Sequence, residues 1–250
     1  MKLLDGKVAL ITGASKGIGR AIALGMADAG ADVIATARTE EELKELCEDI
    51  RKKGRRAEYI VADLRSTEEA RAMAKRALEI FGRVDILVNN AGVSYPQPAF
   101  ETTEDRWDET FQINLKSLFF LTQIIAKDMA DKGGGKIVNI SSQAGLVGLE
   151  DHAAYCASKG GLILLTKVLA IEWGKYKINV NAVAPTIIMT PMAERAWADV
   201  KKREEALKKI PIGRFGQPED VVGAVIFLAS SYADLITGAV LPIDGGYTAQ

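Results

Sequence analysis

Short apolar runs alternate with longer segments of helical periodicity along the whole chain. The first run, Val8–Thr12, is apolar almost without interruption, which is typical of a strand buried on both faces of a parallel sheet. Comparable runs follow at 32–36, 57–61, 84–88, 136–140, 178–183 and 239–241. The alternation of strand and helix predicts an α/β fold in which one doubly wound sheet of about seven parallel strands carries helices on both faces.

No linker, repeat or low-complexity tract interrupts this alternation, so we expect one domain spanning residues 1–250. Helices are expected from a glycine-rich turn to Ala29, at 40–53, after Ser66, at 107–129 and at 218–230. Ser66 and Thr67 precede two glutamates, which is a helix-start signal, and glycines at 133–135 end the helix at 107–129. The segment 187–210 is expected to form a mobile helical flap next to a substrate site.

A glycine-rich loop joins the first strand to the first helix. Its pattern, Thr12-Gly13-x-x-x-Gly17-x-Gly19, sets backbone N–H groups and a helix N-terminus where a pyrophosphate can bind. Glycine suits these positions because side chains would hold the phosphates away from the backbone. The spacing differs from the common G-x-G-x-x-G, but the setting between strand and helix indicates a Rossmann-type dinucleotide site.

The end of the second strand bears on the choice of dinucleotide. An acidic residue there binds the ribose 2′-OH of NAD, whereas an arginine accommodates the 2′-phosphate of NADP. This chain has Ala37 followed by Arg38, and Lys16 in the glycine loop adds a second cation. The pattern favours NADP(H) over NAD(H), with a solvated loop position for Arg38 as the alternative.

Further polar groups follow in the second half of the pattern. Asn89-Asn90-Ala91-Gly92 comes after the fourth strand, where open α/β sheets place ligands, although Asn and Gly also favour simple turns. Asn114 lies among apolar residues of a helix, so it needs a hydrogen-bond partner and is either structural or functional.

Tyr155 and Lys159 are four residues apart and share one face of a helix. A lysine cation lowers the pKa of a nearby phenol and makes it a useful acid or base; a surface pair without function is the alternative.

The composition argues against several classes of protein. Net charge is −1, with 32 basic and 33 acidic residues interspersed, so no basic surface for nucleic acid or an anionic membrane is expected. Cys47 and Cys156 offer neither metal-ligand spacing nor a disulfide framework, and we expect no metal site. The N-terminus is too polar for a signal peptide, and no apolar run reaches the length of a membrane span. These features predict a soluble, cytoplasmic protein.

In this order and spacing, the motifs resemble the short-chain dehydrogenase/reductase family over essentially the whole chain. The matching positions are Thr12 to Gly19, Asn89 to Gly92, Asn114, Ser142, and Tyr155 with Lys159. The resemblance implies a catalytic set in which Tyr155 exchanges a proton with the reacting oxygen and Ser142 donates a hydrogen bond to it. Lys159 would lower the pKa of Tyr155 and hold the nicotinamide ribose, and Asn114 would anchor a water chain leading to Lys159.

The resemblance also implies which residues hold the nucleotide. Asp63 and Leu64 would flank the adenine, Asn90 would line the cleft, and Thr190 would meet the nicotinamide amide. The full expected set is Gly13, Ser15, Lys16, Gly17, Ile18, Gly19, Arg38, Asp63, Leu64, Asn90, Ala91, Gly92, Tyr155, Lys159, Pro185, Thr186, Ile188 and Thr190.

One departure from the family pattern points to a subgroup. Pro185-Thr186 stands where most members have Pro-Gly, which is similar to L-xylulose reductases and polyol dehydrogenases. The other positions that match this subgroup are Met189, Thr190, Trp197, His152 and Cys156. The similarity implies substrate contacts from Ser142, His152, Tyr155 and Trp197. The alternatives are a solvated loop position for His152 and a Trp197 that packs against the core.

The expected function is that of an NADP(H)-dependent oxidoreductase that interconverts a carbonyl and a secondary alcohol by hydride transfer, with tyrosine as acid and base. The expected substrate is a small ketose, polyol or dicarbonyl. Two alternatives remain open: a 3-oxoacyl-[acyl-carrier-protein] reductase, docked through basic residues of the flap, and a nucleotide-binding protein without catalysis. The family also implies a homotetramer, and the apolar last strand is expected to pair with another subunit.

Overall fold

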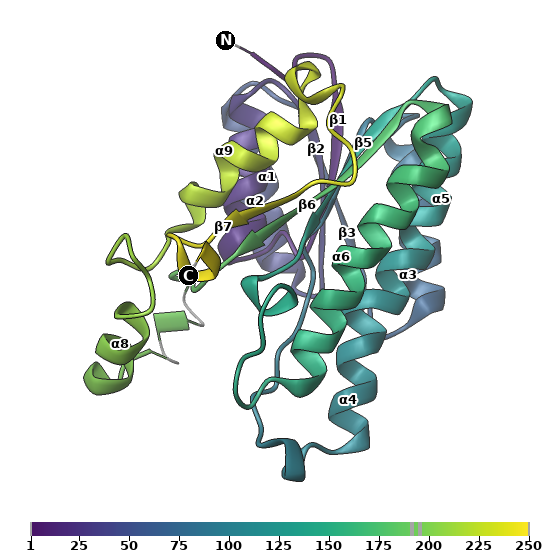
Figure 1. Cartoon of the computed structure of the whole chain (residues 1–250). Coiled ribbons are helices and arrows are strands. Elements are labelled where there is room, and N and C mark those ends of the chain that lie inside the picture. Colours follow the sequence, from purple (N-terminus) through teal and green to yellow (C-terminus); the bar gives the residue numbers. More distant parts are fainter. Residues whose placement is uncertain (1, 191–192, 195–196, 250) are drawn as a thin grey trace.

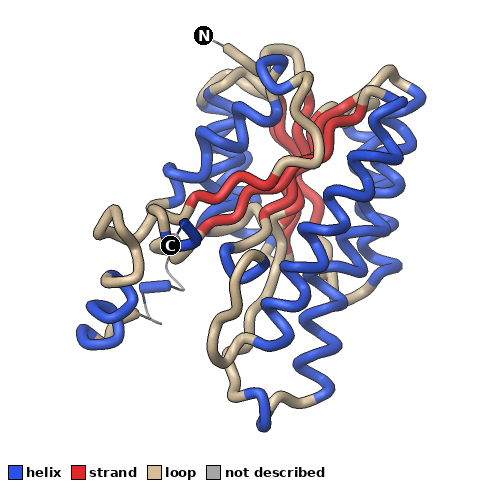
Figure 2. The backbone as a smooth tube through the Cα atoms, viewed as in Figure 1, coloured by secondary structure: helices blue, strands red, loops and turns tan. Residues whose placement is uncertain are grey.

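The computed structural model describes residues 2–190, 193–194 and 197–249, and this part of the chain forms one seven-stranded parallel sheet (Figures 1 and 2). The strand order is β3-β2-β1-β4-β5-β6-β7. The strands are β1 (Val8–Thr12), β2 (Asp32–Ala37), β3 (Ala57–Val61), β4 (Ile86–Asn89), β5 (Gly135–Ile140), β6 (Ile178–Pro185) and β7 (Val240–Ile243). The order reverses between β1 and β4, and such a reversal opens a crevice at the carboxyl ends of the strands.

Helices cover both faces of the sheet (Figure 1). Helices α1, α2 and α9 lie on one face, and α3, α5 and α6 lie on the other. The α-helices are α1 (Gly17–Asp28), α2 (Glu40–Lys52), α3 (Thr67–Ile80), α4 (Glu104–Phe111), α5 (Leu118–Asp131), α6 (Ala153–Trp173), α8 (Val200–Leu207) and α9 (Pro218–Ala229). Shorter helical segments are η1 (Ala99–Glu101), η2 (Gln112–Ser117), η3 (Gln143–Gly145), η4 (Gly174–Tyr176), η5 (Ser231–Ala233) and η6 (Tyr247–Ala249).

Strand β1 shows why its sequence is apolar throughout. All five of its residues are buried. Ala9 and Ile11 pack into the core layer beneath α1, α2 and α9, whereas Val8 and Leu10 pack into the layer beneath α3, α5 and α6. Because successive side chains of a strand point to opposite faces, a strand covered on both sides needs apolar residues at every position.

The predicted fold class is confirmed, and the predicted strands and helices agree with the structure to within a few residues. The predicted helix at 107–129 is the main exception. The chain there runs from α4 through a π-helical segment, η2, into α5. Asn114 lies inside η2, where its side chain bonds a distant loop, so the extra residue in the helical turn has a tertiary cause.

The stretch Ala153–Tyr176, which contains α6, is long and apolar enough to cross a membrane: it has 24 residues, and an 18-residue window within it has a mean hydropathy of 1.4. The expectation that no segment reaches this length is therefore wrong by that measure. A core helix passes the same test, and the buried side chains of α6, such as Leu162 and Leu169, pack in the protein interior. The cytoplasmic location stays a prediction.

The predicted flap at 187–210 forms a separate feature at the carboxyl ends of the strands. After β6, Ile188 makes an isolated parallel bridge with Gly216, and α8 follows outside the two helical layers (Figure 1). Asp199 is the N-cap residue of α8, and its side chain accepts a hydrogen bond from the backbone N–H of Lys202. Residues 191–192 and 195–196 of the predicted flap lie outside the described residues.

Candidate active site

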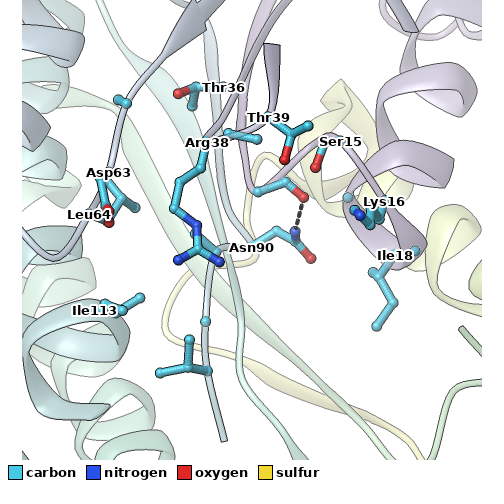
Figure 3. A pocket seen from close by; sticks show the side chains of 18 of the residues that line it. Ser15, Lys16, Ile18, Thr36, Arg38, Thr39, Asp63, Leu64, Asn90 and Ile113 are labelled. Carbon is cyan, nitrogen blue, oxygen red and sulfur yellow. Dashed lines mark hydrogen bonds between the residues drawn. The ribbon is translucent and has the colours of Figure 1, made fainter. Parts of the chain in front are cut away.

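A cleft of about 480 Å³ lies at the carboxyl ends of β1, β2 and β4 (Figure 3). Thirteen of the predicted nucleotide-binding residues line it: Gly13, Ser15, Lys16, Gly17, Ile18, Gly19, Arg38, Asp63, Leu64, Asn90, Ala91, Gly92 and Thr190. Its lining also includes residues that were not predicted, namely Thr36, Ala37, Thr39, Ala62, Val93 and Ile113. Most of these adjoin predicted residues at strand ends, so their position in the sequence was the available signal.

The glycine loop is shaped by contacts that leave no room for side chains. A Cβ atom on Gly19 would lie 2.2 Å from the carbonyl oxygen of Gly13 and 2.4 Å from Nδ2 of Asn90. Gly13 has a φ of +65°, in the left-handed region that favours glycine. The loop therefore presents bare backbone at the start of α1, which fits the phosphates of a dinucleotide.

Asn90 holds the glycine loop against β4. Its Nδ2 donates to the carbonyl oxygens of Thr12 and Gly13, both at 3.0 Å; Figure 3 draws the bond to the glycine loop. The hydroxyl of Thr12 accepts hydrogen bonds from the backbone N–H groups of Asn90 and Ala91, again at 3.0 Å. The predicted Asn90 thus lines the cleft and also fixes the two strand ends that form it.

Arg38 extends its side chain into the cleft between Asp63 with Leu64 on one side and Asn90 on the other (Figure 3). The described residues include no ion-pair partner for its guanidinium. Asp63 is instead paired with Arg65, and this pairing holds the pKa of its carboxyl below the usual value. A free arginine at this strand end suits an added anionic group.

Lys16 lines the same cleft but is paired. Its Nζ lies 2.6 Å from Oε1 of Glu42, which belongs to the first turn of α2. The contact of Lys16 with a cofactor phosphate stays a prediction, because its ammonium is paired with a carboxylate in the structure.

Ser142 and Tyr155 are brought together from the end of β5 and the first turn of α6. Ser142 hydrogen-bonds the Tyr155 side chain, and its Oγ accepts from the backbone N–H of Ala144 at 3.1 Å. Burial raises the pKa of Tyr155, while the hydrogen bond to Ser142 lowers it by a smaller amount. A serine bond that lowers the pKa of Tyr155 is one in which the Ser142 hydroxyl donates to the phenol oxygen.

Lys159 is buried beneath the same site. Its Nζ donates to the carbonyl oxygen of Ile140 at 2.7 Å and lies 5.8 Å from the centroid of the Tyr155 ring. Burial lowers the pKa of Lys159 to about 8. The expected lowering of the Tyr155 pKa by Lys159 is not what the structure shows, because burial raises that pKa.

Asn114 is fully buried and every polar atom of its side chain is engaged. Its Oδ1 accepts from the backbone N–H of Val93 at 2.8 Å. Its Nδ2 donates to the carbonyl oxygen of Val93 and to Oγ of Ser158, both at 3.0 Å. Asn114 thereby fastens the loop after β4 to α6, and a water chain anchored on its side-chain amide stays a prediction without support from these contacts.

Gly92 lets this network approach the cleft. A Cβ atom on Gly92 would lie 3.2 Å from Oδ1 of Asn114 and 3.4 Å from Nζ of Lys159. The cleft, Asn114 and Lys159 are therefore contiguous, and the four predicted catalytic residues form one site next to the predicted nucleotide site.

The remaining predicted residues do not line the cleft. Nδ1 of His152 lies 2.6 Å from the carbonyl oxygen of Glu150, and its ring centroid lies 6.1 Å from that of Tyr155. Trp197 packs on Phe215, with ring centroids 5.5 Å apart, as the packing alternative expected. The predicted nucleotide residues outside the cleft lining are Tyr155, Lys159, Pro185, Thr186 and Ile188.

Thr186, which follows β6, differs from these residues in having an unpartnered side-chain oxygen. Its backbone N–H donates to the carbonyl oxygen of Ile243 at 3.1 Å. Its Oγ1 is buried and has no hydrogen-bond partner among the described residues.

No cluster of three or more His, Cys, Asp or Glu side chains that could hold a metal ion occurs in the described part of the chain.

Comparison with known proteins agrees with this geometry. A family model described as enoyl-(acyl carrier protein) reductase matches residues 13–248. L-xylulose reductase of Bos taurus is 43% identical over 247 residues, covering 98% of each protein. NAD-dependent glycerol dehydrogenase of Listeria innocua is 43% identical over 242 residues, covering 97% of this chain and 94% of the relative. The structure of gluconate 5-dehydrogenase from Burkholderia cenocepacia, in complex with NADP and tartrate, superposes with a TM-score of 0.95 at 36% identity, covering 100% of this chain and 98% of that one.

The fold and the cleft define a nucleotide-binding dehydrogenase or reductase. The chain belongs to the short-chain dehydrogenase/reductase family, with L-xylulose reductases and other polyol dehydrogenases among its relatives.

Proposed function

We propose that this protein is an NADP(H)-dependent oxidoreductase that interconverts a carbonyl and a secondary alcohol on a small polyhydroxy compound, either a ketose and its polyol or a dicarbonyl. The observation that carries the proposal is the convergence of Ser142, Tyr155 and Lys159 beside a cleft with a bare glycine loop. A structural cluster has no need of a phenol, a serine hydroxyl and a buried lysine at the mouth of such a cleft.

When bound, NADP(H) supplies or accepts the hydride. In reduction, the Tyr155 hydroxyl gives its proton to the carbonyl oxygen, and in oxidation it takes that proton back. Ser142 donates a hydrogen bond to the same oxygen and stabilises the charge that develops there. Lys159, when protonated, provides the nearest buried positive charge and favours the phenolate left after proton transfer.

The preference for NADP(H) rests on Arg38, which reaches into the cleft without an ion-pair partner among the described residues, and on the absence of an acid at Ala37. The NADP-bound gluconate 5-dehydrogenase structure supports it, whereas the name of the Listeria relative argues for NAD. An Ala37→Asp/Arg38→Leu variant is expected to shift the ratio of kcat/KM for NADPH and NADH towards NADH by about 100-fold. A wild-type protein that already prefers NADH contradicts the proposed preference.

The substrate class is proposed from relatives that act on xylulose, glycerol and gluconate according to their names. A second candidate is reduction of a 3-oxoacyl thioester, because the matching family model is described as an enoyl-(acyl carrier protein) reductase. A panel of ketoses, polyols, dicarbonyls and a 3-oxoacyl thioester, tested with both nucleotides, separates these candidates. Higher kcat/KM with the thioester than with any polyhydroxy compound would reject the proposal.

We also propose that the protein is a homotetramer. The outer face of α6 exposes Leu164, Val168 and Ile171, with exposed fractions of 64%, 47% and 82%. Strand β7 is an edge strand that exposes Leu241, and both features suit contacts between copies. Multi-angle light scattering at micromolar concentration is expected to give four times the chain mass of 26.9 kDa, and a monomer would exclude the tetramer.

A further inference from the structure

We propose that Glu42 sets the strength of the cofactor preference by holding Lys16 in an ion pair, so that the 2′-phosphate of NADP must compete with a carboxylate for this lysine. The inference rests on the nucleotide site proposed above and assigns a specificity role to a residue of α2 that lies outside the cleft lining.

Lys16 lies at the start of α1 and lines the cleft. It is the N-cap residue of α1 and has an extended backbone, with φ of −141° and ψ of 168°. Its side chain makes no capping bond and instead reaches Oε1 of Glu42 at 2.6 Å. Because Lys16 shares the cleft lining with Ser15, Arg38 and Thr39, this pair lies at the edge of the proposed 2′-phosphate site.

Glu42 is half-buried and has Lys16 as its ion-pair partner. Among the three glutamates of the first turn of α2, Glu40 is paired with Lys44 and accepts from the Tyr59 hydroxyl. Glu42 has one oxygen on Lys16, while its Oε2 is buried and has no hydrogen-bond partner among the described residues. The Glu42 side chain is 30% exposed, compared with 64% for Lys16. The carboxylate is thus the more confined partner and depends on the lysine for compensation.

Glu42 and the 2′-phosphate of NADP would compete for the ammonium of Lys16. Lys16 has a flexible, well-exposed side chain that can turn from Glu42 to another anion. A 2′-phosphate beside Arg38 would draw Lys16 away and leave Glu42 as an unpaired carboxylate, one oxygen of which is already buried without a partner among the described residues. A nucleotide with a 2′-hydroxyl leaves the pair undisturbed. Glu42 therefore weakens the binding of NADP(H) and has no comparable effect on NAD(H).

The test compares dissociation constants of NADPH and NADH, measured by fluorescence titration at low ionic strength. Glu42→Gln is expected to tighten NADPH binding by about three- to tenfold, as suits a partly exposed ion pair, with NADH changed by less than about twofold. Lys16→Met is expected to weaken NADPH binding selectively. In the double variant, removal of the Glu42 charge is expected to have little further effect, because the lysine it restrains is absent.

Glu41→Gln is the matched control, since it removes the same charge from the same helical turn at an exposed residue with no ion pair among the described residues. Thermal unfolding checks that each variant folds, and Glu42→Ala provides a second neutral side chain. An unchanged ratio of the two dissociation constants in both Glu42 variants overturns the proposal. Equal tightening with and without Lys16, or an equal effect of Glu41→Gln, also overturns it, because a general repulsion would then suffice.

The outcome is separable from the proposed cofactor preference. If the wild-type protein prefers NADH, the NADP(H) preference is wrong, yet Glu42→Gln is still expected to move the ratio towards NADPH. If wild type prefers NADPH and Glu42→Gln leaves the ratio unchanged, the preference stands and the role of Glu42 is rejected.

Discussion

The Tyr155→Phe variant is expected to lose turnover by about 10²–10⁴-fold while retaining the nucleotide, because it lacks only the hydroxyl that exchanges the proton. The phenyl ring keeps the packing of Tyr155 near His152 and leaves the glycine loop untouched. Steady-state kinetics measured with saturating nucleotide gives the loss in kcat, and fluorescence titration gives the dissociation constant of the nucleotide.

Tyr176→Phe provides the control for this substitution. Tyr176 lies in η4 at the far end of α6 and is 44% exposed, so the same loss of a hydroxyl is expected to leave kcat unchanged. Undiminished turnover by Tyr155→Phe would remove Tyr155 from the mechanism. Loss of nucleotide binding together with turnover would instead indicate that the substitution damages the cleft.

Gly19→Ala is expected to weaken nucleotide binding by about tenfold or more and to lower the free energy of unfolding by about 1–3 kcal/mol. The new methyl group would meet the Gly13 carbonyl oxygen at 2.2 Å and Nδ2 of Asn90 at 2.4 Å, so the turn must shift and the bonds made by Asn90 must lengthen. Chemical denaturation and nucleotide titration measure the two effects.

Gly223→Ala is the matched control within α9. Gly223 is exposed, and a Cβ atom there would meet nothing within 4 Å. Alanine is the better helix former, so this variant is expected to raise the free energy of unfolding by about 0.5–1 kcal/mol. Unchanged nucleotide affinity in Gly19→Ala would show that the loop tolerates a side chain and that its glycines are not required by the cleft.

The sequence was sufficient to predict the sheet because a strand covered on both faces must be apolar at every position, as β1 is. The glycine loop was predictable for a related reason, since its spacing adjoins both a strand and a helix. Asn90 and Gly92 followed from their place at the end of β4. These features depend on local sequence, so one chain is enough to find them.

Features that depend on partners far along the chain were not predictable. The π-helical segment around Asn114 depends on Val93, twenty-one residues away. The pairing of Lys16 with Glu42 depends on how the starts of α1 and α2 meet. The helical spacing of Tyr155 and Lys159 was enough to place both on one helix, but the direction of the Tyr155 pKa shift depends on burial by surrounding elements.

The position of the flap outside the two helical layers has a consequence for the divergence of such enzymes. Lys159 is attached to β5 and Asn114 to α6 by buried hydrogen bonds, so substitutions there disturb the frame. Trp197 instead packs on Phe215, and Arg203 of α8 lies over the same ring. We therefore expect substitutions in the flap to cost less stability than substitutions at Lys159 or Asn114, which would let the flap diverge while the frame is kept.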